Sequence, residues 1–142
     1  MSRPLHMRHN FPAIEALEAG GLDLDAFARI APGVDPERLL IREARPWFER
    51  LVLRRVAAIA LPYVVYVHSH TYLRPREDLT KLVVHELVHV SQWREDGYLR
   101  FAARYVGDYL RERMRGRSHD EAYRSIRYEV DARACADELL AR

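Results

Sequence analysis

The chain has 142 residues and a mass of 16.7 kDa, which suits one compact domain and leaves no room for a second of ordinary size. Hydrophobic residues make up 49% and charged residues 31%, so the composition excludes a disordered tail, a collagen-like repeat and a membrane channel. The net charge of +2 is too small for charge alone to indicate a nucleic-acid-binding protein.

The sequence carries no sign of export or membrane insertion. Residues 1–10 are polar and are not followed by the apolar segment of a secretory signal. The longest apolar stretch, residues 56–67, is interrupted by Pro62 and is far shorter than the roughly 20 residues that span a bilayer. The single cysteine, Cys135, excludes an internal disulfide framework. We therefore expect a cytoplasmic protein without a transmembrane segment, and no pattern indicates its oligomeric state.

The N-terminal part, residues 1–55, is predicted to be helical. Short helices are expected over residues 11–19, which Gly20 and Gly21 follow, and over residues 23–30, which end before Pro32. Asp35 followed by Pro36 is typical of an N-cap and a first-turn proline, and predicts a further short helix. Another helical turn or two should begin at Pro46.

The remaining part, residues 56–142, is predicted to begin with a small sheet and continue as helices. Two extended runs, 57–61 and 63–68, are rich in β-branched, aromatic and small residues and predict an antiparallel pair. Long helices are expected over 78–95 and 98–115, separated by Gly97. Ser118-x-x-Glu121 has the spacing of a capping box, so a last helix should start there, with a kink near Arg127. The predicted class is a single α+β domain, mostly helical, with a two- or three-stranded sheet.

The first long helix carries the motif His85-Glu86-Leu87-Val88-His89. A spacing of four residues places both imidazoles on one face of a helix, where they could hold one metal ion. Apart from His85, Glu86 and His89, all residues of 82–90 are apolar, so this helix should be buried on nearly all sides. Buried polar groups without partners cost about 2–7 kcal/mol each, and a bound zinc ion with its water removes that cost. The alternative is that two core histidines and a glutamate satisfy one another and the nearby backbone.

A catalytic zinc site needs a third protein ligand. The longer motif, which continues with a glycine and then a third histidine, is excluded, because Gln92 and Glu95 stand where those two residues would be. Glu129, about 40 residues downstream on the last helix, is the preferred donor, and small Ala132 one turn on would allow the helices to approach. Asp131 remains the alternative, and His119 is a weaker one because the capping box already explains it.

The segment from about residue 64 to 134 resembles the gluzincin type of bacterial zinc metallopeptidase. The resemblance lies in His85 to His89 with Gln92 and Trp93, then an arginine-rich helix, then residues 122–126 and Glu129-Val130-Asp131-Ala132. It implies a zincin-like fold with His85, His89 and Glu129 as zinc ligands and Glu86 as general base. The second carboxylate of the family segment is Asp131 rather than Glu here. Arg133 stands where better-known members have an aspartate that supports a ligand histidine.

These residues predict a zinc-dependent metallopeptidase acting on a peptide or protein substrate, with Glu86 moving the proton of the attacking water. By the same resemblance, strand 63–67 would be the edge with which an extended substrate pairs. The donor to the oxyanion could be Tyr123, Tyr128 or His119. The alternative function is a non-catalytic, zinc-stabilised binding module for a protein or nucleic-acid partner.

Four other features are interpreted as structural, without a role in the metal site. His68 and His70 share one face but have no third donor at a suitable spacing, so they are expected to be surface or cleft-lining residues. Cys135 is expected to be a small core residue. Tyr98, Tyr105 and Tyr109 recur at helical spacing and are expected in the core. The arginine cluster of residues 111–117 is expected to be a solvated helix end without sequence-specific nucleic-acid binding.

Overall fold

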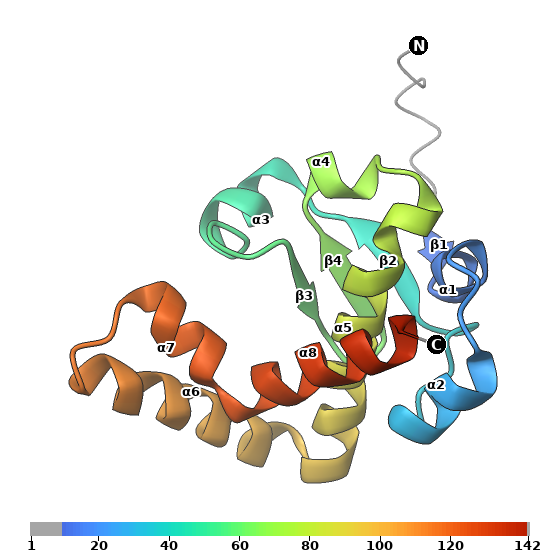
Figure 1. The fold of residues 1–142 in the computed structure, drawn as a ribbon. Helices are drawn as coiled ribbons and strands as arrows, with labels where there is room; N and C mark the ends of the chain where they lie inside the picture. Colours follow the sequence, from blue (N-terminus) through green and yellow to red (C-terminus); the bar gives the residue numbers. More distant parts are fainter. Residues whose placement is uncertain (1–9, 142) are drawn as a thin grey trace.

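The structure is a computed structural model that describes residues 10–141 (Figure 1). Helices account for 62% of it and the rest of the regular structure is a small sheet, so the predicted α+β class is confirmed. The helices described are α1 (Ile14–Ala19), α2 (Leu24–Ile30), α3 (Pro46–Leu51), α4 (Ser69–Tyr72), α5 (Arg76–Asp96), α6 (Tyr98–Met114), α7 (His119–Ser125) and α8 (Arg127–Leu140). The strands are β1 (Phe11–Pro12), β2 (Leu40–Glu43), β3 (Ala58–Ala60) and β4 (Val64–Val67). The two histidines near the N-terminus, His6 and His9, to which we assign no role, lie outside the described residues.

The sheet has four strands in the order β1-β2-β4-β3. The predicted antiparallel pair is confirmed, since β3 runs antiparallel to β4 with Ile59 opposite Tyr66. The sheet as a whole is mixed, because β2 runs parallel to β4 and β1 runs antiparallel to β2. The expectation of two or three strands in a purely antiparallel sheet was therefore wrong. The missing strands come from residues 1–55, which were predicted to be helical.

The helix predicted after Asp35 and Pro36 is only a turn. The Asp35 carboxylate does accept a hydrogen bond from the Glu37 amide at 3.0 Å, as an N-cap would. The chain then extends into β2, because this places Leu39 and Ile41 in the core, where each is at most 2% exposed. Parallel pairing with β4, far along the chain, outweighs the local preference for a helix. Similarly, the helix expected from residue 11 begins only at Ile14, since β1 precedes it.

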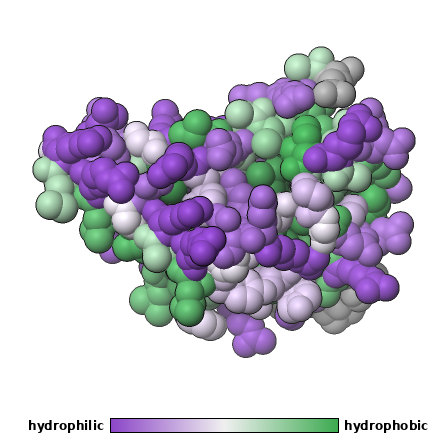
Figure 2. All heavy atoms as spheres, turned by 90° about the horizontal axis from the view of Figure 1, so that it is seen from below, coloured by the Kyte–Doolittle hydropathy of each residue, from purple (hydrophilic) through white to green (hydrophobic). Residues whose placement is uncertain are grey.

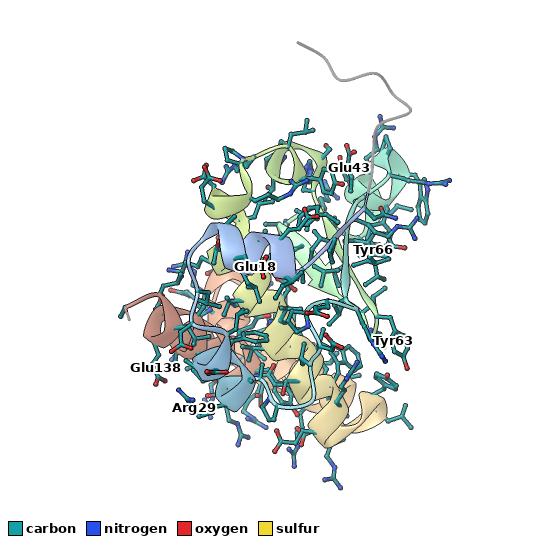
Figure 3. The ribbon with its side chains drawn as sticks, turned by 90° about the vertical axis from the view of Figure 1, so that its right-hand side faces the viewer. Glu18, Arg29, Glu43, Tyr63, Tyr66 and Glu138 are labelled. Carbon is teal, nitrogen blue, oxygen red and sulfur yellow. The ribbon has the colours of Figure 1, made fainter. Side chains whose placement is uncertain are left out.

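Strand β4 lies inside the sheet, so the expectation that strand 63–67 forms the substrate-pairing edge was wrong. The free edge on that side is β3. Val65 and Val67 point into the core, and Tyr66 lies on the opposite face, with its ring centre 5.1 Å from that of Phe48. Figure 3 shows Tyr63 and Tyr66 on the side of the sheet away from the long helices.

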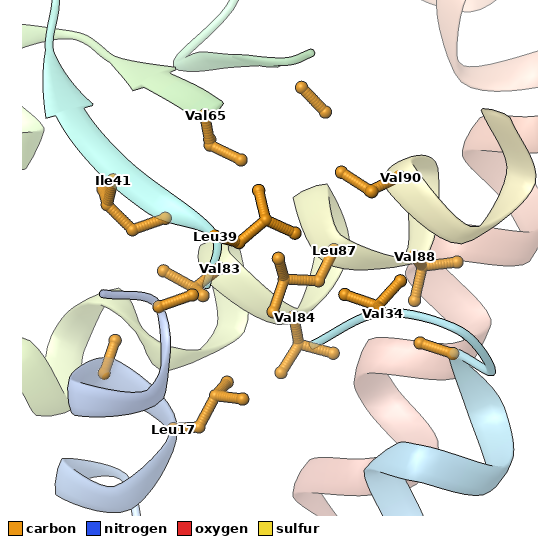
Figure 4. Close-up of a cluster of buried hydrophobic side chains, with 14 of the residues drawn as sticks. Leu17, Val34, Leu39, Ile41, Val65, Val83, Val84, Leu87, Val88 and Val90 are labelled. Carbon is orange, nitrogen blue, oxygen red and sulfur yellow. The ribbon is translucent and has the colours of Figure 1, made fainter. Parts of the chain in front are cut away.

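Helix α5 passes through the centre of the molecule against the sheet, with α1 and α8 packed along it. Figure 4 shows Val83, Val84, Leu87 and Val90 of α5 facing Leu39 and Val65 in the main core. Ten residues of α5 are buried, so the prediction of a helix covered on nearly all sides is confirmed. The motif histidines are therefore carried by a rigid element.

Helices α6 and α7 form an arm that extends from the body (Figure 1). Gly97, at a φ of 79°, allows the sharp turn between α5 and α6. The capping box at Ser118 is confirmed, and the chain breaks between α7 and α8 at Ile126, as the predicted kink requires. A second core of Phe101, Ile126 and Tyr128 holds the arm to α8.

The surface of this arm is mixed. Figure 2 shows hydrophobic patches that remain between charged side chains on the face seen from below. Four large apolar residues of α6 are exposed: Leu99, Val106, Leu110 and Met114. None of the helices within residues 10–141 is both long enough and apolar enough to cross a membrane.

Candidate metal centre

Helices α5 and α8 bring together the three side chains that the sequence indicates as metal ligands. His85 and His89 lie one turn apart on α5, and Glu129 lies in the first turn of α8. Ala132, which is fully buried, allows α8 to approach α5 closely. The His85 Nε2 atom lies 2.9 Å from Glu129 Oε2, and His89 Nε2 lies 3.1 Å from both Glu129 Oε1 and His85 Nε2. We call these three residues the triad.

The triad fits a zinc ion in donor type and in size. Two imidazole nitrogens and one carboxylate form a common protein ligand set of catalytic zinc sites, which leave a fourth position open. Two corners of a tetrahedral site with ligands about 2.0 Å from the ion lie about 3.3 Å apart. The observed separations of 2.9–3.1 Å need only a small expansion to admit the ion. Within residues 10–141, no other three His, Cys, Asp or Glu side chains lie close enough together to hold one metal ion.

Gln92 fixes the orientation of His89. The Gln92 amide nitrogen donates to the backbone carbonyl of Tyr128 at 3.1 Å, which can only accept. The Gln92 oxygen must then face His89 Nδ1, 2.7 Å away, and accepts its proton. In neutral His89 this leaves the lone pair of Nε2 directed at the triad, as a metal ligand requires. Gln92 thus orients His89. An aspartate at the position of Arg133 would support a ligand histidine in the same way.

We predict that Gln92→Ala weakens zinc binding by about 10–100-fold, because an outer partner that orients a ligand histidine is removed. The fold should persist, since Gln92 is only half-buried on α5. Competition with a fluorescent zinc chelator measures the affinity. Glu95→Ala, an exposed position one turn further along α5, is the matched control and should leave the affinity unchanged. An unchanged affinity in Gln92→Ala would contradict this role.

The electrostatics of the triad favour a cation between its members. Burial would raise the pKa of Glu129, but hydrogen bonds from His85, His89 and Tyr105 outweigh it and hold this pKa well below the usual carboxyl range. Burial would lower the pKa of His89, but the Glu129 hydrogen bond and the charge of Glu86 raise it above its ordinary value. The Tyr105 hydroxyl donates to Glu129 Oε1 at 2.7 Å and so fixes this carboxylate in place.

Glu86 is the unusual member of the motif. It is 6% exposed, and burial raises the pKa of its carboxyl group. Among residues 10–141 no side chain or backbone group hydrogen-bonds to this carboxylate. Its oxygens are not among the fully buried side-chain atoms without a partner, because Glu86 lines open space beside the triad, where a water or a substrate group can bind it.

Two hollows meet at Glu86. The first, about 290 Å³, is enclosed mainly by Val56, Ile59, Trp93, Phe101 and Val106, and we call it the apolar hollow. The second, about 490 Å³, has Arg55, Lys81, Arg124 and Arg133 around it, and we call it the basic hollow. Glu86, Glu129, Tyr123 and Ala58 of edge strand β3 line both. The site is therefore reachable from either side of Glu86.

The structure separates the remaining candidates. Asp131 is exposed and does not join the triad. His119 accepts or donates a hydrogen bond with Tyr109 at 2.8 Å, and the Tyr128 hydroxyl donates to Asp96, so neither of these two side chains lines a hollow. Of the three possible oxyanion donors, only Tyr123 borders both hollows.

The histidine pair, the cysteine and Tyr109 of α6 behave as expected. His68 lies 3.6 Å from Glu49, and its ring centre lies 4.1 Å from that of His70 with the two rings tilted. No third ligand joins this pair among the described residues. Cys135 packs against the main core, and burial raises the pKa of its thiol. The core expectation was wrong for Tyr98, which is 49% exposed. Tyr105 has a further role, because the sequence suggests only a core position and the structure places its hydroxyl on Glu129. No sequence signal identifies it, since its partner depends on how the arm folds back.

Three arginines of the cluster at residues 111–117 pair with two carboxylates of α6. Arg111 pairs with Asp108 at 3.2 Å, while Arg115 and Arg117 pair with Glu112 at 2.9 and 2.8 Å. These contacts agree with the interpretation of a solvated helix end.

We predict that any nucleic-acid binding by this cluster is weak, independent of base sequence, and steeply reduced by salt, because it would arise from counterion release alone. Fluorescence anisotropy with several labelled DNA and RNA oligonucleotides across a salt series measures this. Affinity that tolerates salt and depends on base sequence would contradict the prediction and favour the binding-module alternative.

No family model, no curated protein and no solved structure matches this chain. The resemblance to gluzincin peptidases therefore remains a hypothesis that rests on the motif residues, and the function is argued from the geometry of the site.

Proposed function

We propose that this protein is a zinc-dependent peptidase. The observation that carries the proposal is the position of Glu86, a buried carboxylate without a hydrogen-bond partner among residues 10–141, where two hollows meet beside the triad. A zinc ion held by His85, His89 and Glu129 would lower the pKa of a bound water from 15.7 to about 7 and polarise a carbonyl group.

The side chains around the ion have distinct roles in this proposal. The Glu86 carboxylate accepts the proton of the attacking water and then donates it to the nitrogen of the leaving amine. Tyr123, which borders both hollows, donates its hydroxyl proton in a hydrogen bond to the carbonyl oxygen as negative charge develops there. Tyr105 and Gln92 act indirectly, since they hold Glu129 and His89 in place.

The free edge of β3 gives an extended substrate a place to bind. Ala58 borders both hollows, so a peptide that pairs with β3 would pass across Glu86. Backbone hydrogen bonds to an edge strand give affinity, and alternating side chains enter pockets that give specificity. This assigns to β3 the part that the sequence suggested for β4.

The alternative, a zinc-stabilised binding module, uses the same triad but leaves Glu86 unexplained. A structural zinc site normally closes its fourth position with a protein ligand, whereas the open space here faces two hollows. We propose the cytoplasm as the compartment, since the chain has a single cysteine and so no internal disulfide.

The proposal predicts that the purified protein cleaves members of a mixed peptide library, that a chelator abolishes cleavage, and that added zinc restores it. Mass spectrometry of the library before and after incubation detects the products. A chelator that has no effect on the cleavage pattern would contradict a metal-dependent mechanism.

A further inference from the structure

The two hollows that meet at Glu86 differ in chemistry. The apolar hollow is walled by Val56 and Ile59 of the β3 region, by Trp93 at the end of α5, and by Phe101 and Val106 of α6. Burial of a large apolar side chain in such a space favours binding, because apolar surface is removed from water. Its volume of about 290 Å³ gives room for one aromatic or long aliphatic side chain.

The basic hollow differs in the charged side chains around it. Four cations lie around it, Arg55, Lys81, Arg124 and Arg133. Apart from Glu86 and Glu129 of the site, its one acidic side chain among the described residues is Asp78. Lys81 is paired with Asp137 at 2.9 Å, and Arg133 donates to the backbone carbonyl of Arg124. Within residues 10–141 the guanidinium groups of Arg55 and Arg124 have neither an ion pair nor a hydrogen bond, and both are exposed.

We propose that the substrate peptide carries a large apolar residue on one side of the cleaved bond and an acidic residue on the other, the first in the apolar hollow and the second against Arg55 and Arg124. This inference rests on the proposed peptidase function and names its substrate class. A substrate peptide paired with β3 passes Ala58 and Glu86, which border both hollows. Peptide side chains on one side of Glu86 therefore reach the apolar hollow, and those on the other side reach the basic hollow. Arginine suits this task because its planar guanidinium binds a carboxylate through two parallel hydrogen bonds.

The test uses binding as well as cleavage. Labelled peptides with a central Phe carry Glu, Gln or Lys two residues away, in one series on the N-terminal side and in another on the C-terminal side. Fluorescence anisotropy measures their affinity for zinc-loaded Glu86→Gln protein, which should not cleave them. We expect about a tenfold preference for Glu over Gln in one series, with Lys weakest, and a preference that shrinks at high salt.

A double charge-reversal variant locates the acidic contact. Arg55→Glu and Arg124→Glu, introduced together into the Glu86→Gln protein, should remove or invert the preference for Glu peptides over Lys peptides. Both side chains are exposed, so circular dichroism should show an unchanged fold. Arg29→Glu is the matched control, because Arg29 is an exposed arginine on α2 that borders neither hollow (Figure 3).

Helix α6 offers a matched pair for the apolar contact. Val106 and Leu110 are 53% and 52% exposed, lie one turn apart, and differ in that Val106 borders the apolar hollow and Leu110 does not. Val106→Asp should weaken binding of the Phe peptides about tenfold and leave peptides with Ala in place of Phe nearly unaffected. Leu110→Asp should change neither.

The outcomes separate this inference from the proposed function. Equal affinity for Glu, Gln and Lys peptides, or a preference that survives the double arginine variant, overturns the acidic specificity even if wild type cleaves peptides. Equal effects of Val106→Asp and Leu110→Asp overturn the apolar contact. Selective binding that responds to the variants as expected, without cleavage by wild type, supports the assignment of the hollows and contradicts the peptidase.

Discussion

Glu86→Gln is expected to retain the metal and the fold while peptide hydrolysis falls by at least 10²-fold, the effect typical of a lost general base. Glutamine keeps the size of the side chain but cannot accept and return the proton. Glu86 is not a member of the triad, so zinc content should match that of wild type. Loss of a buried carboxylate that has no hydrogen-bond partner among the described residues should leave thermal stability equal or slightly higher. Rates on one cleaved peptide, with zinc determined on the same samples, measure the effect.

Glu95→Gln is the matched control, since Glu95 is an exposed glutamate on the same helix and lies outside both hollows. It should cleave at the wild-type rate. Undiminished cleavage by Glu86→Gln would show that Glu86 is not the base, or that another protease is present. Zinc bound to wild type and Glu86→Gln, with no cleavage of any library peptide by either protein, would favour the binding module.

The elements with strong local signals could be predicted from the sequence. Helix α2 begins after its Asp23 cap, α7 after the capping box of Ser118, and α5 ends at Gly97, close to the predicted positions. In each case a side chain or a glycine within a few residues determines the boundary, so no knowledge of distant contacts is required.

Elements that depend on distant partners could not be predicted. Strand β2 has four residues, of which only Ile41 is buried, and its preceding Asp35 and Pro36 resemble a helix start. It becomes a strand because β4, more than 20 residues later, provides a parallel partner. Insertion of β4 between β2 and β3 also moves the free edge from β4 to β3. Sheet order depends on such pairings and not on local propensity.

The candidate site shows the same division. The spacing of His85 and His89, and the helix that carries Glu129, are visible in the sequence, and the structure brings the three together. Gln92 was recognisable as a helix neighbour of His89, three residues on, but its hydrogen bond to the Tyr128 carbonyl depends on how α8 packs. Tyr105 reaches Glu129 only because α6 packs against α8.

The zinc content of Glu129→Ala and Asp131→Ala tests most directly the claim that α5 and α8 together hold one zinc ion. Wild type and Asp131→Ala should each contain about one zinc per chain by elemental analysis after dialysis, because Asp131 is exposed and outside the triad. Glu129→Ala should lose the ion, with an affinity loss beyond the 10–100-fold of an outer partner. Circular dichroism confirms that each variant is folded. Zinc retained by folded Glu129→Ala, or lost from Asp131→Ala, would contradict this ligand set, and a wild-type protein that takes up no zinc would contradict the metal centre itself.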